Sequence, residues 1–263
     1  MAVQELIAAA RKIVFKLGSN TLAGEDGTIN TAFLGEFAGQ TADCVSRGKQ
    51  IVLVSSGAQV AGLSTMGKWA RKKDLHYRQA LCAVGQVELM DAWRRAFEPY
   101  GCHIAQILLT REDFSDPIRT LNMRNTLFTL VDEGVIPIIN ENDTVSVEEI
   151  KIGDNDNLAA LSAILWSADL LVLFSDIDGL YSKNPKEFPD AELVEEIRDI
   201  DQARKNVSIG AVSNFGTGGI ATKLDAAQRA FSYGIPTILT HGGRPRCLEA
   251  LASGRQKGTV FLA

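Results

Sequence analysis

Short apolar runs alternate with amphipathic helical segments along most of the chain. Strands are predicted for IVFKLGSN (13–20), IVLV (51–54), HIAQILLT (103–110), GVIPIINEN (134–142), LLVLF (170–174), LVEEI (193–197), IPTILTHGG (235–243) and the closing GTVFLA. Helices are predicted for residues 3–11, 30–48, 76–100, 120–133, 158–168 and 224–234, and for a segment that opens at residues 55–57. Strands that are apolar throughout are buried on both faces. The alternation therefore predicts an α/β fold, with a mainly parallel sheet that helices cover on both sides.

The chain is predicted to form a single domain, residues 1–263, with two lobes that meet near residue 160. No linker, low-complexity segment or short repeat interrupts the alternation of elements. Pro137 lies inside a predicted strand. Because proline lacks the N–H that a sheet ladder needs, it predicts an edge strand or a bulge at this point.

The segment KIGDNDN (151–157) is a dense polar cluster where a predicted strand gives way to a predicted helix. Open α/β sheets bind ligands at such junctions. An ordinary turn is the alternative, because Asn, Asp and Gly favour turns through local hydrogen bonds. A second polar cluster, NEND (140–143), ends the preceding strand, and two clusters so close together favour a ligand site.

Three further junctions offer groups that suit an anion. Lys16 stands near the end of a buried strand and beside a glycine, although an edge lysine is the alternative there. Ser56 and Gly57 open a helix whose free N–H groups and dipole favour a phosphate or carboxylate. The segment SNFGTGGIATK (213–223) ends at Lys223, which is predicted to start a helix; alone, this segment fits a surface loop as well as a phosphate loop.

Composition narrows the classes of function. The chain has 27 basic and 32 acidic side chains and a formal net charge of −5, which argues against nucleic acid as a partner. No apolar run reaches the roughly 18–20 residues of a membrane span, and the N-terminus lacks a signal-peptide pattern. A soluble, cytoplasmic protein is therefore expected, with no membrane partner. The four cysteines and three histidines are scattered, so neither a disulfide framework nor a metal site is predicted.

The candidate residues suit phosphoryl transfer, which depends on positioning and charge neutralisation. Lys16 and Lys223 both adjoin Gly-rich turns, and they can shield the transferring group and the β-phosphate of the donor. A carboxylate between them can orient both, and Asp156 is selected for that role. These three residues are the predicted catalytic set, because no Ser–His–Asp set or reactive-cysteine context offers covalent catalysis.

The phosphoryl acceptor is expected to be a carboxylate. No general base for a hydroxyl acceptor stands out, although an Asp could serve, whereas a carboxylate is already ionised at neutral pH. The helix start at Ser56 and Gly57 can screen the negative charge of such an acceptor. An amino-acid acceptor also needs an acidic partner for its ammonium group, which Asp143 with Asn142 can supply.

The motifs VFKLGSN, VSSGAQVAG, INENDTV, KIGDNDNLAALSA, FSDIDGLY and GTGGIATK, in this order, resemble the glutamate 5-kinase branch of the amino acid kinase family. The resemblance runs from about residue 12 to the end, and the pair INEND and IGDNDN is its most specific part. It implies a three-layer αβα sandwich, with an N-terminal lobe (12–160) for the amino acid and a C-terminal lobe (161–263) for ATP. It implies ATP-dependent phosphorylation of the γ-carboxylate of L-glutamate, the first step of proline biosynthesis, with Mg²⁺ bound mainly through the nucleotide.

The resemblance also assigns residues to these roles. It gives Lys16, Asp156 and Lys223 the functions argued above and places glutamate at Ser56, Asp143 and Asn155. Asp154 is expected to hold either the substrate or its own loop. The expected ATP-binding residues are Lys16, Ser175, Asp176, Thr217, Gly218, Gly219, Ile220, Ala221, Thr222 and Lys223.

Alternatives remain within the same fold. They are kinases that act on acetylglutamate, aspartate, carbamate or uridylate, and a non-catalytic ligand sensor, against which the complete lysine–aspartate set argues. Many members carry a C-terminal PUA domain, and a form without it is expected here because the chain ends just after GTVFLA. A homo-oligomer, either a dimer or a tetramer, is expected. The labile acyl phosphate product suggests a hand-off to glutamyl phosphate reductase.

Overall fold

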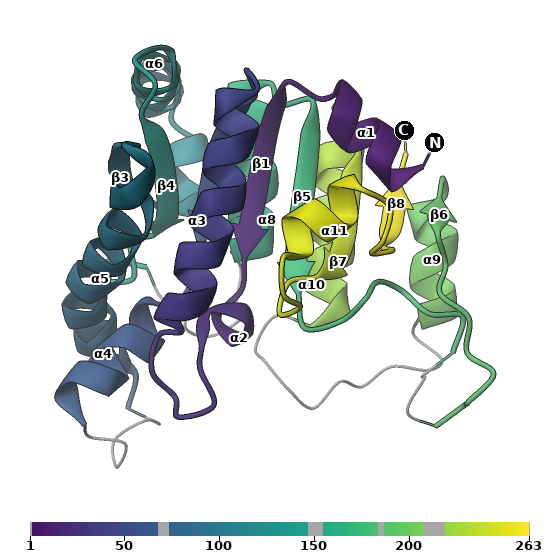
Figure 1. The fold of residues 1–263 in the computed structure, drawn as a ribbon, viewed down its shortest axis with the longest axis horizontal. Helices are drawn as coiled ribbons and strands as arrows, with labels where there is room; N and C mark the ends of the chain where they lie inside the picture. The colour runs from purple at the N-terminus through teal and green to yellow at the C-terminus, as the bar shows by residue number, and fades with distance from the viewer. Residues whose placement is uncertain (1, 68–73, 147–154, 184–186, 208–218, 263) are drawn as a thin grey trace.

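The computed structural model, which describes residues 2–67, 74–146, 155–183, 187–207 and 219–262, contains an eight-stranded sheet between layers of helices (Figure 1). The strands follow the order β3-β4-β2-β1-β5-β7-β8-β6 across the sheet. Their bounds are β1 Lys12–Leu17, β2 Gln50–Ser55, β3 Ile104–Leu109, β4 Ile136–Glu141, β5 Leu170–Ser175, β6 Glu196–Ile197, β7 Thr237–His241 and β8 Thr259–Phe261. Every neighbouring pair in this sheet is parallel except β7 and β8, which confirms the mainly parallel sheet.

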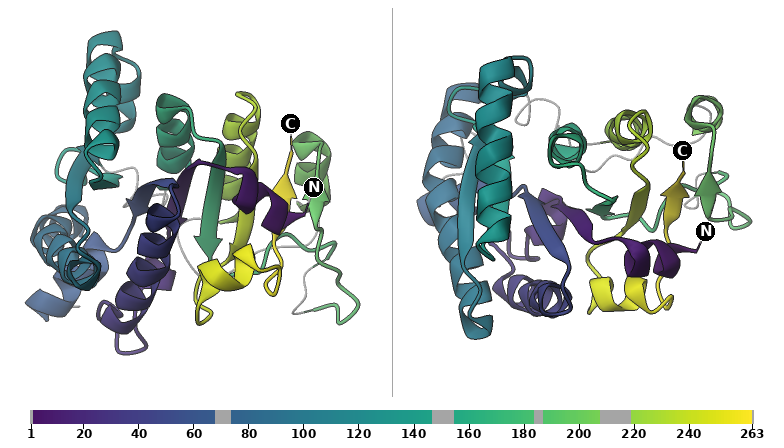
Figure 2. Two further views of the ribbon diagram at one scale, coloured as in Figure 1. Left: turned by 45° about the horizontal axis from the view of Figure 1, so that its top comes forward. Right: turned by 90° about the horizontal axis from the view of Figure 1, so that it is seen from above.

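Helices cover both faces of the sheet, so the predicted αβα sandwich is confirmed (Figure 2). One face packs against α1 (Val3–Ala9), α3 (Thr31–Ser46), α5 (Leu75–Phe97) and α11 (Cys247–Ala252). The other face packs against α6 (Pro117–Asp132), α8 (Asn155–Trp166), α9 (Ile200–Val207) and α10 (Ile220–Phe231). Two more helices, α2 (Ser19–Leu22) and α4 (Ala58–Met66), follow β1 and β2. Within the described ranges, no helix is long and apolar enough to cross a bilayer.

Lys16 faces the α8 side of the sheet because side chains alternate along β1. Val14, two residues earlier, packs in the core beside α8. Phe15 points to the opposite face, where its ring meets Phe37 of α3 and Phe174 of β5 at centroid distances of 5.9 and 5.8 Å. The alternation thus buries an aromatic cluster on one face and presents an ammonium group on the other.

Pro137 does not mark an edge of the sheet. β4 lies between β3 and β2, so the predicted edge strand is wrong, and the continuous β3–β4 register excludes a bulge at this position. The N–H of Ile136 donates to the carbonyl oxygen of His103 on the β3 side. The nitrogen of Pro137 therefore faces β2, where the ladder pairs only Ile138 and Ile139 of β4. The proline occupies the position just before that ladder begins, and it costs no ladder hydrogen bond.

Three short helices, α2, α9 and α11, were not predicted, and α6, α8 and α10 each begin three or four residues earlier than predicted. The eight residues of α9 and the six of α11 are too few to show a helical period in the sequence. α10 begins at Ile220 rather than at residue 224, so Lys223 lies inside the first turn and does not start the helix.

Lys49 anchors the C-terminal end of α1. Its Nζ donates to the carbonyl oxygens of Ile7, Ala8 and Ala10 at 2.7, 3.1 and 2.7 Å. These are carbonyls that the end of a helix leaves without an intrahelical partner. One ammonium group with three donors therefore replaces the missing helical bonds and holds α1 against the sheet.

Candidate active site

Lys16, Asp156 and Lys223 form one buried, ion-paired cluster. The Nζ of Lys16 lies 2.6 Å from Oδ1 of Asp156, and the Nζ of Lys223 lies 3.1 Å from its Oδ2. Asp156 is fully buried, and each lysine is 6% exposed. β1 supplies Lys16 near its carboxyl end, while Asp156 and Lys223 come from the first turns of α8 and α10. The structure thus brings together the three residues that were predicted to be catalytic.

The two ammonium groups determine the ionisation of the Asp156 carboxyl. Burial alone raises its pKa, but the charges of Lys16 and Lys223, with hydrogen bonds from both, lower it by more. The pKa of Asp156 therefore lies below its ordinary value, and the group is a carboxylate at neutral pH. With one carboxylate between two ammonium groups, the cluster carries excess positive charge in a place that water hardly reaches. It therefore attracts an anion.

α10 begins beside this cluster without a side-chain cap. Its N-cap is Gly219, so no side chain accepts from the first N–H groups of the helix. A Cβ at Gly219 would meet none of the described residues within 4 Å. Thr222 closes the turn, with its Oγ1 3.0 Å from Oδ2 of Asp156 and 2.9 Å from the carbonyl oxygen of Gly219. Among the described residues, neither a side-chain cap nor a Cβ at Gly219 covers these N–H groups, which therefore suit an anion.

A second polar network begins one residue earlier on α8. The Nδ2 of Asn155 donates to Oγ of Ser56 at 2.7 Å and to Oδ1 of Asn140 at 2.9 Å. Asn140 also accepts from the backbone N–H of Glu141 at 2.9 Å and donates from Nδ2 to Oε1 of Gln86 at 2.8 Å. Ser56, Asn140 and Asn155 are at most 3% exposed. Two residues predicted to bind the amino acid, Ser56 and Asn155, are therefore in direct contact.

The start of α4 depends on two glycines. Gly57 has a φ of +106°, a conformation that favours glycine. α4 also begins without a side-chain cap. Behind it, a Cβ on Gly85 of α5 would lie only 1.8 Å from the carbonyl oxygen of Ala58. Trp93 of α5 supports the preceding strand end, because its Nε1 donates to Oγ of Ser55 at 2.9 Å. Close packing on α5 thus positions the uncapped N–H groups of α4.

Asn142 and Asp143 follow β4 at the same end of the sheet. The backbone N–H of Asn142 donates to Leu109 of β3, and its carbonyl accepts from Ser146. Gln79 of α5 donates from Nε2 to the carbonyl oxygen of Asp143 at 3.0 Å, and Asp143 is 6% exposed. These contacts hold both residues at the edge where β4 ends, beside the network of Asn140.

Ser175 and Asp176 lie on the other side of β1, at the end of β5. The hydroxyl of Ser175 donates to Oδ1 of Asp176 at 3.0 Å, and Nδ2 of Asn20 donates to its Oδ2 at 3.2 Å. The N–H of Gly242, after β7, donates to the carbonyl oxygen of Ser175 at 2.7 Å. Since β1 lies between β2 and β5, Ser56 and the pair Ser175 and Asp176 flank the strand that carries Lys16.

Several predicted residues lie outside the described ranges: Asp154, Thr217 and Gly218. Ile220 and Ala221 form the start of α10. Three polar residues of these networks, Asn140, Gln86 and Asn20, were not predicted from the sequence. A role for Asn140 could have been predicted, because Asn140 belongs to the polar cluster that ends β4. Gln86 lies in the middle of a long helix, where nothing in the neighbouring sequence indicates a role in the site.

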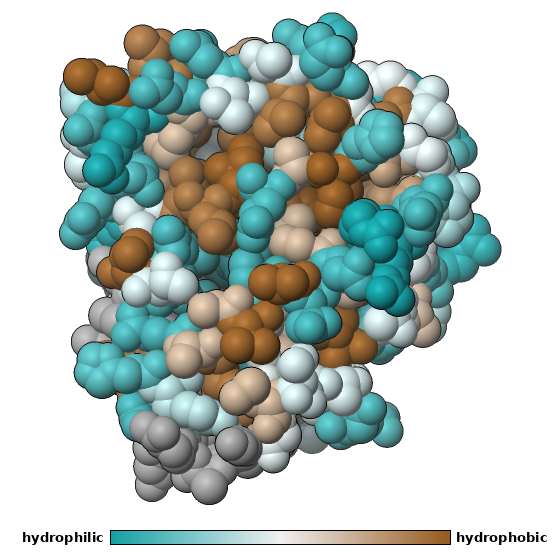
Figure 3. All heavy atoms as spheres, turned by 90° about the vertical axis from the view of Figure 1, so that its left-hand side faces the viewer, coloured by the Kyte–Doolittle hydropathy of each residue, from teal (hydrophilic) through white to brown (hydrophobic). Residues whose placement is uncertain are grey.

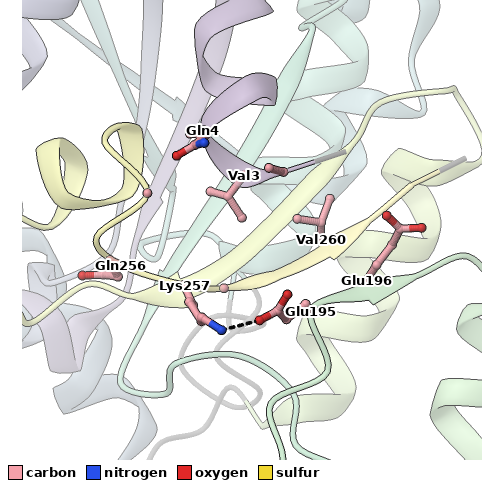
Figure 4. Close-up of a pocket in the computed structure, with 10 residues that line it drawn as sticks. Val3, Gln4, Glu195, Glu196, Gln256, Lys257 and Val260 are labelled. Carbon is pink, nitrogen blue, oxygen red and sulfur yellow. Dashed lines mark hydrogen bonds and ion pairs between the residues drawn. The ribbon is translucent and has the colours of Figure 1, made fainter.

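A surface pocket and a buried cysteine of the described chain lie apart from this cluster. A pocket of about 440 Å³ lies where the start of α1 meets β8, with Val3 and Val260 among its lining residues (Figure 4). Its Lys257 and Glu195 pair with each other at 2.5 Å. Burial raises the pKa of the Cys247 thiol to about 12, which excludes a thiolate nucleophile there. Among the described residues, His, Cys, Asp and Glu side chains do not gather in groups of three that could hold a metal ion.

An anion-attracting cluster at the carboxyl ends of parallel strands, with uncapped helix starts beside it, defines a phosphate-handling α/β protein. The chain belongs to the amino acid kinase family, whose family model matches residues 11–241. It is 62% identical to the glutamate 5-kinase of Alkaliphilus metalliredigens (strain QYMF) over 261 residues, which cover 99% of each chain. It is 45% identical to the glutamate 5-kinase of Geobacter sulfurreducens over 257 residues, which cover 98% of this chain and 69% of that relative.

Solved structures with similar folds have other substrates in their names. The UMP kinase of Ureaplasma parvum superposes with a TM-score of 0.66 at 14% identity and covers 96% of this chain and 99% of its own. The UMP kinase of Bacillus anthracis superposes with a TM-score of 0.64 at 16% identity and covers 96% of each chain. At these identities the similarity demonstrates a shared fold.

Proposed function

We propose that this chain transfers the γ-phosphoryl group of ATP to the γ-carboxylate of L-glutamate and forms L-glutamyl 5-phosphate, the first step of proline biosynthesis. One observation carries the proposal: α8 joins two polar networks through consecutive residues. Asn155 belongs to the network of Ser56 and Asn140, and Asp156 belongs to the lysine cluster. A binding site for a polar substrate thus adjoins a charge cluster for a phosphoryl group. The glutamate 5-kinase relatives support glutamate as that substrate.

The geometry suits an in-line displacement that needs no general base. An oxygen of the ionised γ-carboxylate attacks the γ-phosphorus of ATP, the bond from phosphorus to the β–γ bridging oxygen breaks, and ADP leaves with the electron pair. Lys16 and Lys223 neutralise the charge on the transferred group and on the leaving oxygen, and Asp156 holds both ammonium groups in position. All three act as pre-positioned charges, so the chemistry requires no covalent intermediate.

Mg²⁺ fits this chain best as an ion bound mainly through the nucleotide. Asp156 is already paired with two lysines, and Asp176 accepts from Asn20 and Ser175. Neither carboxylate resembles part of a dedicated all-protein cage. When bound to the phosphates, Mg²⁺ supplies further neutralisation of the negative charge.

We assign the amino acid to the β2–β4 side and ATP to the β5–β7 side, which corresponds to residues 12–160 and 161–263. Ser56, Gly57, Asn142, Asp143, Asp154 and Asn155 bind glutamate in this assignment, and Ser175, Asp176 and residues 217–223 bind ATP. Both hydrogens of Asn155 Nδ2 are used within the protein, so its carbonyl oxygen is the part that it offers to the α-ammonium group.

We also propose that the chain forms a homo-oligomer, a dimer or a tetramer. β3 is an unpaired edge in the described sheet, and apolar residues are exposed beside it: Leu108, Ile118 and Leu121 are 37%, 72% and 56% exposed. Apolar patches are visible on this side of the molecule (Figure 3). Sedimentation at micromolar concentration tests the proposal, and a monomer at all concentrations would contradict it.

The product is an acyl phosphate, which hydrolyses readily, so we propose a hand-off to glutamyl phosphate reductase in the cytoplasm. All four cysteines are free thiols, which fits a reducing compartment. Cross-linking of the two enzymes during turnover tests the hand-off, and the lack of any cross-link would remove it.

Hydroxylamine trapping tests the reaction itself. With glutamate and Mg-ATP, γ-glutamyl hydroxamate should form, and ADP release should depend on glutamate. Acetylglutamate, aspartate, carbamate and uridylate serve as the comparison acceptors. Turnover with one of these and none with glutamate would overturn the proposed substrate.

A further inference from the structure

Gln86 lies on α5, behind the polar network of Asn140 and Asn155. We infer that Gln86 is a positioning residue for the amino-acid substrate. It holds Asn140, and through Asn140 it holds Asn155, in the one orientation that presents the Asn155 carbonyl oxygen to the substrate. This inference rests on the proposed function and names a further determinant of how that site binds its amino acid.

The direction of the network follows from a single backbone group. The N–H of Glu141 can only donate, and it donates to Asn140, so the atom that accepts it must be Oδ1. Nδ2 of Asn140 then points to α5, where Gln86 presents Oε1 at 2.8 Å. Since Oδ1 of Asn140 is an acceptor, Asn155 must present its Nδ2 to it. The orientation of Asn155 is therefore determined by contacts that lie outside the substrate site.

Gln86 stabilises this orientation at the end of the network farthest from Ser56. Without an acceptor on α5, the buried Nδ2 of Asn140 would lack a partner, and a rotated Asn140 would no longer match Asn155. The Nε2 of Gln86 is buried and has no hydrogen-bond partner within the described ranges. In the described part of the chain, the contact between Oε1 of Gln86 and Asn140 is therefore the one polar side-chain contact that replacement of Gln86 removes.

α5 is a suitable support for such a contact. Gly85, the preceding residue, lies against the carbonyl oxygen of Ala58, so the helix cannot shift toward or away from α4 without loss of packing. Gln79, seven residues before Gln86 and hence on the same face of the helix, holds the carbonyl oxygen of Asp143. α5 thus contacts two polar segments of the amino-acid site from behind.

The test compares Gln86→Met with Gln40→Met and Gln86→Glu. Gln40 on α3 is a matched control, because it is also half-buried and its Oε1 also accepts one hydrogen bond, from the N–H of Glu249 at 2.9 Å. Gln86→Met keeps the length of the side chain and removes the acceptor oxygen. Gln86→Glu keeps an acceptor oxygen for Asn140.

Gln86→Met should raise KM for glutamate by roughly 5- to 30-fold, while KM for ATP and kcat should change by less than about 3-fold. Gln86→Glu should restore most of the glutamate affinity, and Gln40→Met should leave both KM values unchanged. Calorimetric titration with glutamate should reproduce the change in affinity without turnover.

Two results would overturn the inference alone. In the first, the wild-type protein phosphorylates glutamate and the Gln86→Met variant has an unchanged KM for glutamate. In the second, the thermal stability of Gln86→Met falls and its KM for ATP rises as much as its KM for glutamate. Such a result would indicate a structural role for Gln86. A wild-type protein that does not phosphorylate glutamate would overturn the proposed function, and the inference with it.

Discussion

Asn155 and Asp156 are consecutive residues of α8, and their side chains belong to two different polar networks. The Nδ2 of Asn155 lies 2.7 Å from Oγ of Ser56, whereas Oδ1 of Asp156 lies 2.6 Å from Nζ of Lys16. Successive side chains on a helix diverge by about 100°, so one turn of backbone can serve two neighbouring sites. The backbone of α8 therefore sets the position of the network of Ser56 and Asn140 relative to the lysine cluster.

Replacement of Lys223 by alanine should lower kcat by about 10²–10³-fold, because it removes a positioned charge whose interaction strengthens in the transition state. ATP should still bind, with an affinity that changes far less than kcat. Steady-state kinetics and nucleotide titration measure the two effects. Lys257→Ala is the control, because Lys257 is exposed and pairs only with the exposed Glu195 among the described contacts. Near-full activity in Lys223→Ala would contradict the assigned role.

Asp156→Asn should destabilise the protein by about 3–5 kcal/mol, because it leaves two buried ammonium groups without their carboxylate. The free energy of unfolding, from urea titration at pH 7, measures this loss. Asp225→Asn removes one partner of an exposed pair with Arg204 and should cost at most about 1 kcal/mol. Equal losses in the two variants would show that the buried cluster contributes no more than a surface ion pair.

The contribution of Asp156 to stability should depend on pH. Its pKa in the folded protein lies below its ordinary value of 3.8, because the two lysines outweigh the effect of burial. Its stabilising effect is therefore fully present above about pH 5 and is lost as the pH falls below 3.8 toward the lowered folded pKa. The difference in unfolding free energy between wild type and Asp156→Asn should be constant from pH 6 to 7 and shrink in acid. A difference that grows in acid would contradict the direction of the shift.

Gly85→Ala should separate α4 from α5, because the added Cβ would lie 1.8 Å from the carbonyl oxygen of Ala58. The expected cost is about 1–3 kcal/mol of stability, together with weaker glutamate binding, since α4 starts at Gly57 beside Ser56. Gly35→Ala on α3 is the matched control: its Cβ would meet nothing within 4 Å, so alanine should stabilise that helix by about 0.5–1 kcal/mol. Thermal unfolding of both variants, with glutamate titration, tests the pair, and equal stabilities would refute the close-packing argument.

The elements of the core could be predicted because burial leaves a strong signal in sequence. Runs such as residues 51–54 and 170–174 are apolar throughout, and the structure places both in central parallel strands. Pro137 was misread because sequence alone does not show on which side a strand's ladder begins. The start of α10 was placed too late because a Gly- and Thr-rich segment resembles a loop until tertiary contacts, here from Thr222 to Asp156, close its first turn.

The types of residue in the candidate site could be predicted from the sequence. Their contacts with one another could be predicted only in part. Lys16, Asp156 and Lys223 stood out because charged residues rarely adjoin apolar strands and Gly-rich turns without a reason. The roles of Asn140 and Gln86 could not be predicted. The role of a buried amide depends on the residue that it contacts in the folded protein. That residue can be far away in the sequence, so the neighbouring sequence does not indicate the contact.

The sequence alone was enough to predict the core strands and the longer helices, the residues that carry the charge, and a chemistry that suits phosphoryl transfer. These properties follow from local periodicity and residue type. Two arrangements come from the tertiary structure: one carboxylate lies between two ammonium groups, and a chain of amides from α5 reaches Asn155. Both arrangements join residues that are far apart in the chain, and they depend on strand order and helix packing.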